Sequence, residues 1–250
     1  MKYTKNQYKA INHWEGNLQI IACAGSGKTD VITRRIAKLV SAGVPKESIV
    51  SFTFTENAAE ELKFRIRKHL QDLQPDDPEI GDMYVGTIHS FCYRLLQDFK
   101  PSYKAHDVLD EHKRVLFVST YDHARRIGLK DFFKRSYRNF EKFCLNVDVV
   151  REEMIDPKYL PEEFRKCFEN YIKLLDEERF LDFSGMMHLV YHYLLTDVEF
   201  ATKVFNRIQY VIVDEYQDIN PLQEKLIELL TERNGNLCVV CVSFSDDSPI

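Results

Sequence analysis

The sequence predicts an α/β fold in which a domain with a parallel sheet is interrupted by a helical insertion. Three observations lead to this prediction. Over the first hundred residues, short apolar runs with strand character alternate with runs of helical periodicity. From about Pro101 to Phe205 the periodicity is helical, with almost no strand signal. Strand character returns in the last fifth of the chain, where it completes the sheet.

The expected strands are separated by helices, and this alternation implies parallel pairing between strands. The strands are predicted at Leu18–Ala22, Ile49–Phe54, Tyr84–Thr87, Tyr210–Val213 and Leu237–Val242. Helices are predicted after the first strand as far as Gly43 and Pro45, from Ala58 to Leu70, at Ile88–Phe99 and after Pro221. We therefore expect the sheet domain to comprise residues 1–100 and 206–250, and the insertion to comprise residues 101–205.

Composition and charge exclude several classes of protein. The residues are 44% hydrophobic and 29% charged, and no apolar run approaches the roughly 18 residues typical of a membrane span. The N-terminus lacks the apolar segment of a signal peptide, so we expect a cytoplasmic location. Six scattered cysteines fit reduced thiols better than a disulfide framework. The net charge of −5 argues against a protein that coats nucleic acid indiscriminately, but it permits a local basic groove.

Three further patterns have both a structural and a functional interpretation. Cys238 and Cys241 form a C-x-x-C pair, but they lie in an apolar run without a second pair, so a structural role is favoured over a zinc site. His188 and His192 are four residues apart on an expected helix, yet no Glu follows His188 as a zinc-protease motif requires, so helix-face histidines are favoured. Two basic clusters are either nucleic-acid contacts or solvated helix faces. They are Lys63, Arg65, Arg67 and Lys68, and Arg125, Arg126, Lys130, Lys134, Arg135 and Arg138.

The segment Ala22–Thr29, with the sequence ACAGSGKT, lies between an expected strand and an expected helix and has the pattern of a phosphate-binding loop. Gly25 and Gly27 permit a tight turn that points backbone N–H groups at phosphate oxygens. The helix that begins here adds its positive dipole end. Lys28 is expected to neutralise the β- and γ-phosphates of ATP, and the Thr29 hydroxyl is expected to bind Mg²⁺. The strict pattern begins with Gly instead of Ala, but the flanking elements disfavour a chance glycine turn.

Two further candidate site residues, both acidic, follow the apolar run at Tyr210–Val213. Asp214, at the carboxyl end of this expected strand, is placed to hold Mg²⁺ through water. Glu215 is placed to orient or deprotonate the attacking water, which hydrolysis requires and simple binding does not. Acidic residues after a strand are common, so this pair is informative because a phosphate loop precedes it.

Four blocks, taken in order, resemble the motifs of the UvrD/Rep helicases of superfamily 1. The blocks are the phosphate loop at Ala24–Thr29, Thr53–Ile66, which is similar to motif Ia, Val85–Phe91, which is similar to motif Ib, and Val213–Asp218, which is similar to motif II. Gln7 lies where the family has its adenine-reading glutamine, and the resemblance extends from Asn6 to Val240. It assigns ATP binding to Gln7, Ala24, Gly25, Ser26, Gly27, Lys28 and Thr29.

The resemblance implies an ATP-driven translocase that moves 3′ to 5′ on single-stranded DNA, which is the expected partner. The helical insertion then resembles subdomain 1B, set into the first RecA-like domain, 1A. By position, Phe54 is expected to stack on a base, a common way to bind single strands. Thr55 and Asn57 are expected near the path that connects DNA with ATP, and Thr87 and His89 near the DNA backbone. From the residues alone, a core position for Phe54 is favoured.

Three departures from the family pattern count against a complete motor. Asp30 stands where many relatives have an arginine that packs on adenine, and Ile88 replaces a common phenylalanine. After Val240 the sequence does not continue into motif III. We therefore expect a truncated or frame-shifted product that binds ATP, hydrolyses it slowly and unwinds no duplex. The alternatives are a non-catalytic ATP-binding remnant and, disfavoured by the motif Ib block and the long insertion, another P-loop enzyme such as a nucleotide kinase.

Overall fold

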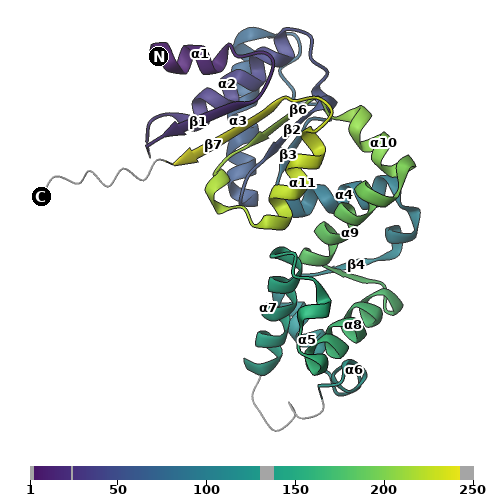
Figure 1. Cartoon of the computed structure of the whole chain (residues 1–250). Helices are drawn as coiled ribbons and strands as arrows, with labels where there is room; N and C mark the ends of the chain where they lie inside the picture. The colour runs from purple at the N-terminus through teal and green to yellow at the C-terminus, as the bar shows by residue number, and fades with distance from the viewer. Residues whose placement is uncertain (1–2, 24, 130–137, 243–250) are drawn as a thin grey trace, which may run out of the picture. The chain divides into compact units, whose positions relative to one another are not determined.

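The computed structural model of the protein describes residues 3–23, 25–129 and 138–242 (Figure 1). The chain divides into two compact units. The sheet unit comprises Met1–Phe91, Val198–Ile219 and Leu226–Ile250, and the helical unit comprises Cys92–Asp197 and Asn220–Lys225. Because the long segment of the helical unit separates two parts of the sheet unit, the predicted α/β fold with a helical insertion is confirmed.

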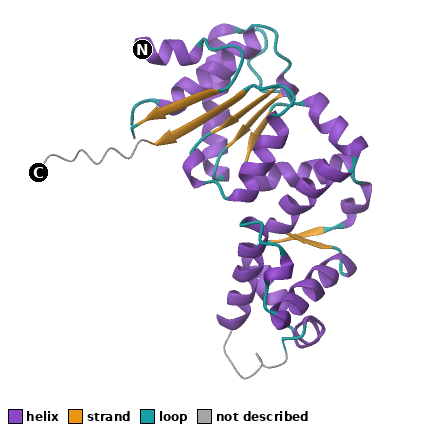
Figure 2. Ribbon diagram, viewed as in Figure 1, coloured by secondary structure: helices purple, strands orange, loops and turns teal. Residues whose placement is uncertain are grey.

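The sheet unit contains a five-stranded parallel sheet with the order β1-β7-β6-β2-β3 (Figure 2). The strands are β1 (Leu18–Ala22), β2 (Ile49–Phe52), β3 (Tyr84–Gly86), β6 (Tyr210–Val213) and β7 (Leu237–Val242). In the centre of the sheet, Ile212 pairs with Ser51 on one side and with Cys238 on the other. All of β2 and most of β6 are buried, which explains why their sequences are continuous apolar runs.

The predicted second strand is two residues too long, because β2 ends at Phe52. The Thr53 N–H still donates to the Gly86 carbonyl (3.0 Å), but the Thr53 hydroxyl donates to the Thr55 carbonyl (3.0 Å). This local hydrogen bond competes with the sheet pattern and turns the chain before Phe54. The predicted third strand is likewise one residue too long.

Four helices of the described chain lie wholly in the sheet unit, and two of the four share one core with the strands. They are α1 (Lys5–Ile11), α2 (Lys28–Ser41), α3 (Glu56–Leu73) and α10 (Val198–Arg207), with the single-turn helices η1 (Lys46–Ser48) and η5 (Tyr216–Asp218). Two further helices, α4 (Ile88–Phe99) and α11 (Pro221–Thr231), have residues in both units. Ile36 of α2 and Ile66 of α3 are fully buried in the core that also contains Ile212 of β6. The packing of α2 and α3 therefore fixes the helix that follows the phosphate loop.

Several helices of the helical unit share one apolar core that includes aromatic rings. Its elements are η2 (Pro101–Ala105), α5 (Glu111–Ser119), α6 (Tyr121–Ile127), α7 (Arg138–Glu152), η4 (Pro157–Tyr159), α8 (Glu162–Glu177) and α9 (Phe183–Thr196). Phe143 of α7 meets Tyr171 of α8 in a T-shaped contact with ring centroids 5.7 Å apart. Both rings belong to one apolar cluster, which gives this unit a core of its own.

One feature of the insertion was not predicted. β4 (Asp107–Leu109) and β5 (Phe180–Asp182) form a two-stranded parallel sheet within the helical unit. Each strand has three residues, which is too short for alternation to be recognised in a sequence. The prediction of almost no strand in this region is therefore corrected by one short pair.

The remaining structural predictions concern cysteines, histidines and membrane spans. All six cysteines are free thiols, and Cys238 and Cys241 lie in β7. His188 and His192 lie on α9, and no cluster of potential metal ligands is present within the described part of the chain. No helix among the described residues is long and apolar enough to cross a membrane.

Candidate nucleotide and nucleic-acid site

Parallel strands place their carboxyl ends at the same edge of a sheet, and α/β proteins bind ligands at this edge. Four predicted functional segments directly follow β1, β6, β2 and β3 (Figure 1). They are the phosphate loop, Asp214 with Glu215, Phe54 with Thr55 and Asn57, and Thr87 with His89. The sheet therefore brings together residues that are far apart in the sequence.

The phosphate loop has the backbone conformation that its glycines predict. Gly25 and Gly27 have φ angles of 74° and 83°, in the left-handed region that other residues seldom adopt. Gly27 is the N-cap of α2, and no side chain caps this end of the helix. The first N–H groups of α2 are therefore available to an anion. Ala24, which was also predicted to bind ATP, lies outside the described residues.

Lys28 and Thr29 form the start of the first turn of α2. The Lys28 ammonium donates to the carbonyl of Ala22 (3.4 Å), so its side chain spans the loop from end to start. The Thr29 carbonyl accepts the Thr33 hydroxyl (2.9 Å). The two residues that were predicted to bind phosphate and metal are thus held side by side at the helix start.

Gln7 lies beside the loop. It forms a capping box with Thr4 at the start of α1, and its side-chain amide donates to the Ser26 carbonyl (3.0 Å). A pocket of about 550 Å³ is lined by residues from α1, β1 and the loop, among them Gln7, Ser26 and Lys28. The glutamine therefore contacts the phosphate loop directly and borders a cavity next to it.

Asp214 lies at the carboxyl end of β6, and its N–H donates to the Phe52 carbonyl of β2 (3.0 Å). Burial raises the pKa of Asp214, and the neighbouring carboxylate of Glu215 raises it further. The Glu215 N–H, 3.0 Å from Asp214 Oδ1, and the charge of Lys28 oppose this increase. The charge of the phosphate-loop lysine therefore acts on the carboxylate at the end of β6.

Glu215 has a left-handed backbone, with φ at 52°, which is a strained conformation for a residue with a side chain. Its carboxylate accepts a hydrogen bond from Gln217 Nε2 (2.8 Å), and the side-chain oxygen Oε1 of Gln217 accepts the Val242 N–H of β7 (3.2 Å). Gln217 therefore holds the Glu215 side chain relative to the sheet. Gln217 was not among the predicted site residues, although it lies within the motif II block.

Asp30, which departs from the family pattern, contacts other residues of the sheet unit. Its carboxylate is 3.1 Å from His69 Nε2 of α3, and the other ring nitrogen of His69 is 3.3 Å from an Arg34 guanidinium nitrogen. Burial and the hydrogen bond to Asp30 raise the pKa of Tyr3 to about 12. This position therefore connects α2 to α3.

Phe54 is 63% exposed, so the core position favoured from the residues alone is wrong. The strand ends before Phe54, and Thr55 immediately caps α3 by accepting the Ala58 N–H (3.1 Å). Asn57 is exposed on the first turn of the same helix. An exposed ring beside a helix start is a feature that a flat ligand such as a base can contact.

The two predicted nucleic-acid segments are linked by a hydrogen-bond cluster. Glu56 of α3 accepts the Thr87 hydroxyl (3.0 Å) and the Ser90 hydroxyl (2.8 Å) of the α4 start. The Tyr84 hydroxyl donates to the Thr87 carbonyl (2.7 Å). His89 is half-buried on the first turn of α4. Glu56 and Ser90 were not singled out from the sequence, although both lie in the quoted blocks.

The basic clusters are largely paired with carboxylates. The pairs are Lys63 with Glu60 (2.7 Å), Arg65 with Glu61, Arg67 with Glu79 (3.3 Å), Arg125 with Asp122 (3.3 Å), and Arg126 with Glu177 and Glu178 (2.5 and 2.8 Å). These pairs favour the interpretation as solvated helix faces. Lys130, Lys134 and Arg135 lie outside the described residues.

Comparison with known proteins agrees with this arrangement. The chain matches the UvrD/REP helicase N-terminal domain over residues 3–241. It is 30% identical over 246 residues to the ATP-dependent DNA helicase PcrA of Bacillus subtilis, an alignment that covers 94% of this chain and 32% of the relative. It is 28% identical over 247 residues to DNA helicase II of Haemophilus influenzae, covering 90% of this chain and 31% of the relative.

The chain thus spans about a third of the length of the curated relatives it matches. The match covers the phosphate loop, the sheet that carries it and the helical insertion. The five-stranded parallel sheet is consistent with a RecA-like helicase domain. From its sequence and its fold, the chain belongs to the UvrD/REP helicase N-terminal domain family.

Proposed function

We propose that this chain forms the ATP-binding and hydrolysing part of a DNA helicase motor that translocates 3′ to 5′ on single-stranded DNA. The observation that carries the proposal is the placement of the phosphate loop, the Asp214–Glu215 pair and the exposed Phe54 at one edge of a single parallel sheet. In this proposal the sheet unit corresponds to subdomain 1A and the helical unit to subdomain 1B. The relatives named as ATP-dependent DNA helicases support the same function.

Nucleotide binding is assigned to the loop between β1 and α2. The uncapped N–H groups at the start of α2 and the helix dipole favour the negative charge of phosphates. Lys28 adds a cation that interacts with the β- and γ-phosphates. Gln7, which is hydrogen-bonded to Ser26, is placed to read the adenine once the phosphates occupy the loop. Gly25 and Gly27 supply the turn that these contacts require.

Thr29 and Asp214 are assigned to Mg²⁺. A hydroxyl and a carboxylate are oxygen ligands of the kind that Mg²⁺ prefers, and phosphate oxygens complete such a set. A nearby cation favours the ionised form of a carboxyl group, so a bound Mg²⁺ would offset the burial and the Glu215 charge that raise the pKa of Asp214. When bound with the nucleotide, Mg²⁺ neutralises charge on the β- and γ-phosphate oxygens.

Glu215 is assigned as the residue that orients or deprotonates the attacking water. Glu215 directly follows Asp214, and its N–H donates to the Asp214 carboxylate (3.0 Å). Gln217 restrains the Glu215 carboxylate through its side-chain amide, and the restraint limits the number of side-chain conformations. The strained backbone of Glu215 is consistent with a functional position.

Single-stranded DNA is assigned to the loops after β2 and β3. Phe54 presents an exposed ring for stacking, and Thr55 and Asn57 lie at the start of the adjoining helix. Thr87 and His89 are assigned to the DNA backbone. The Glu56 carboxylate accepts hydrogen bonds from the Thr87 and Ser90 hydroxyls, and these bonds connect the two loops.

The test of nucleotide binding is a comparison of two lysine variants. Lys28→Ala should weaken binding of a fluorescent ATP analogue with Mg²⁺ by about 1.5–3 kcal/mol, which is roughly ten- to a hundredfold, because the phosphates lose a charged hydrogen-bond donor. Lys46→Ala is the matched control, because Lys46 pairs with the exposed Asp77 (2.5 Å) away from the loop. Equal affinities in the two variants would contradict the assignment.

Hydrolysis requires a separate test, because binding alone fits a non-catalytic module. The chain joined to the remaining part of a relative such as PcrA should hydrolyse ATP faster when a single-stranded oligonucleotide is added. Glu215→Gln in this protein should retain ATP binding and lose turnover, because the amide cannot accept a proton from water. Turnover that survives this substitution would assign the step to another residue.

A further inference from the structure

The helix α1 carries Gln7, the residue proposed to read the adenine, but little apolar packing holds this helix in place. Of the seven residues Lys5–Ile11, Ile11 alone is buried, and Tyr8 is 61% exposed. A helix of about two turns is not stable in water by itself. The position of Gln7 therefore depends on contacts between α1 and the neighbouring helix α2 (Figure 1).

Arg35 of α2 makes one of these contacts. The residue is 2% exposed, and its Nη1 donates to the Ala10 carbonyl in the last turn of α1 (3.3 Å). Among the residues that the structure describes, Nε has no hydrogen-bond partner and no carboxylate forms an ion pair with this arginine. Burial lowers the pKa of Arg35, because the charged form loses its water. Arg35 therefore carries a buried charge whose hydrogen bond goes to α1.

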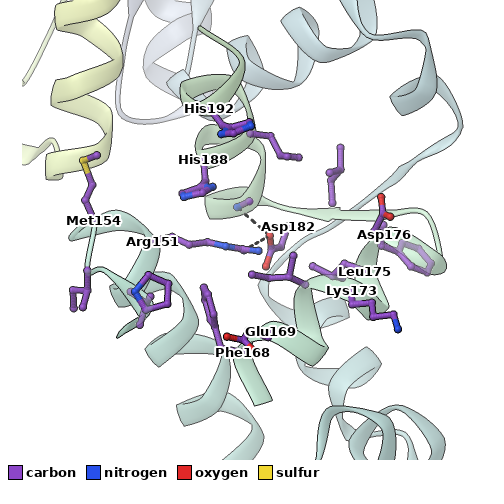
Figure 3. A pocket seen from close by; sticks show the side chains of 18 of the residues that line it. Arg151, Met154, Phe168, Glu169, Lys173, Leu175, Asp176, Asp182, His188 and His192 are labelled. Carbon is purple, nitrogen blue, oxygen red and sulfur yellow. Dashed lines mark hydrogen bonds and ion pairs between the residues drawn. The ribbon is translucent and has the colours of Figure 1, made fainter. Parts of the chain in front are cut away.

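The buried arginines of the helical unit have a different arrangement. Arg151 pairs with Asp182 (2.6 Å), as Figure 3 shows. Arg114 pairs in the same way with Asp148 (2.6 Å). Burying a charged side chain is costly unless an opposite charge compensates it, and an apolar side chain would fill the position of Arg35 at lower cost. The hydrogen bond to α1 is the contact that an apolar side chain could not replace.

A second side chain of α2 binds the same end of α1. Lys38 follows Arg35 by three residues, so the two side chains lie on one face of α2. The Lys38 ammonium donates to Oδ1 of Asn12, the C-cap of α1 (2.6 Å). The same ammonium lies 5.5 Å from the centroid of the Tyr8 ring. Two cationic side chains of α2 thus hold the carboxyl end of α1.

The anchored end of α1 is one turn away from Gln7. Gln7 and Ala10 are three residues apart and lie on the same face of the helix. Gln7 Nε2 donates to the Ser26 carbonyl of the phosphate loop (3.0 Å), so a shift of α1 would move this amide relative to the loop. An amide can donate to N7 of adenine and accept from N6, whereas guanine has acceptors at both O6 and N7. Discrimination between the two bases therefore depends on where the amide lies.

We propose that Arg35 and Lys38 are positioning residues, which hold the carboxyl end of α1 and thereby set the preference of the nucleotide site for adenine over guanine. This inference rests on the proposed nucleotide binding and on Gln7 as the residue that reads the base. The phosphate contacts are assigned to other groups, which are Lys28 and the first N–H groups of α2. Arg35 and Lys38 should therefore affect which base is bound and leave phosphate binding largely unchanged.

Fluorescent ATP and GTP, each labelled on the ribose and supplied with Mg²⁺, test the proposal on the full chain. The parent should bind the ATP analogue about tenfold or more tightly than the GTP analogue. Gln7→Ala should bring this ratio close to one. Arg35→Met should lower the ratio by about three- to tenfold, the effect of one lost hydrogen bond, with little change in affinity for the GTP analogue.

The double variant of Gln7→Ala with Arg35→Met distinguishes positioning from a general role in the fold. If Arg35 acts through Gln7, adding Arg35→Met to Gln7→Ala should not weaken binding of the ATP analogue further. The thermal midpoint of Arg35→Met should be unchanged or higher, because an apolar side chain of similar length replaces a buried charge. A further loss of affinity in the double variant, or a lower thermal midpoint with an unchanged ratio, would overturn the proposal.

Lys38→Met tests the second contact, and it decides the question if Arg35→Met loses the far-UV circular dichroism of the parent. It should lower the ratio by about threefold. Arg67→Met is the matched control, because Arg67 is exposed on α3 and pairs with Glu79 (3.3 Å), so the ratio should stay unchanged. Unchanged ratios in both α2 variants would overturn the positioning role while the proposed function stands. Failure of the parent to bind either analogue would contradict the proposed function, and this inference with it.

Discussion

Each unit places an aspartate where a strand ends, and the two carboxylates have opposite surroundings. Asp182 ends β5 in the helical unit, is 1% exposed, and accepts hydrogen bonds from Arg151 (2.6 Å) and Tyr171 (2.8 Å). Burial by itself raises the pKa of Asp182, but the charges of Arg151 and Arg114 outweigh burial, and the pKa is lowered. Asp182 therefore stabilises the core of its unit as an ionised group.

Asp214 follows β6 in the sheet unit and is half-buried. Burial and the charge of Glu215 raise its pKa, and the Glu215 N–H and Lys28 offset only part of this effect. A carboxylate whose ionisation is opposed by its surroundings gains free energy when a cation binds. The two pKa values shift in opposite directions because the partners differ: arginines surround Asp182, whereas the carboxylate of Glu215 lies beside Asp214.

The largest expected effect is that of removing the Asp182 carboxylate. Asp182→Ala should lower the free energy of unfolding by about 3–5 kcal/mol, because the charge of Arg151 remains buried without its partner. Urea denaturation followed by far-UV circular dichroism measures this loss.

Asp122→Ala is the control within the same unit. Asp122 is an exposed carboxylate that pairs with Arg125 at 3.3 Å, and such surface pairs contribute less than about 1 kcal/mol. If both variants lost the same stability, the buried cluster around Asp182 would have no special role in the core.

The second prediction concerns the exposed ring at the sheet edge. Phe54→Ala should weaken binding of a single-stranded oligonucleotide by about 1–3 kcal/mol, the value of one base–aromatic stack. Fluorescence anisotropy with a labelled oligonucleotide measures the change. The fold should be unaffected, because the ring is 63% exposed.

Phe64→Ala is the matched control for this prediction. Phe64 is 67% exposed on α3 of the same unit, outside the loops assigned to DNA. Its removal should leave affinity for the oligonucleotide unchanged. A loss of stability in Phe54→Ala with unchanged DNA affinity would make Phe54 a structural residue.

Much of the sheet unit was predictable because short stretches of its sequence have the pattern of the element that they form. Buried parallel strands give continuous apolar runs, and β1, β6 and β7 match their predicted bounds. The end of β2 was missed because strand propensity does not change there. The strand ends at a hydrogen bond of the Thr53 side chain. β4 and β5 were missed because three-residue strands that are distant in sequence leave no periodic pattern.

Some features of the candidate site could likewise be proposed from the sequence, and others could not. The phosphate loop and the Asp214–Glu215 pair are short motifs formed by residues that are adjacent in the sequence, so a local sequence pattern is enough to propose them. The contacts from Glu56 to Thr87 and from Asp30 to His69 join separate helices, and no local pattern encodes them. The exposure of Phe54 also depends on tertiary structure. Sequence therefore predicts the groups of a site better than the network that holds them.

The smallest expected effect on the free energy of unfolding is that of replacing Asp214, and this replacement should stabilise the protein instead of destabilising it. Because folding raises the pKa of Asp214, the folded state binds its proton more tightly than the unfolded state. Its contribution to stability is therefore full below the unfolded pKa and is lost as pH rises through the folded pKa. Asp214→Asn should be slightly more stable than the parent at pH 7, since the amide carries no charge and its oxygen still accepts the Glu215 N–H.

The pH dependence separates Asp214 from Asp182. The advantage of Asp214→Asn should disappear as pH falls and the parent carboxyl becomes protonated. The contribution of Asp182, whose pKa is lowered by folding, should instead be present above the unfolded pKa and lost as pH falls through the folded pKa. Urea denaturation of the parent and both variants at several pH values measures the two slopes. A loss of stability in Asp214→Asn at pH 7 would mean that the ionised group stabilises the fold, and the contrast between the two aspartates would fail.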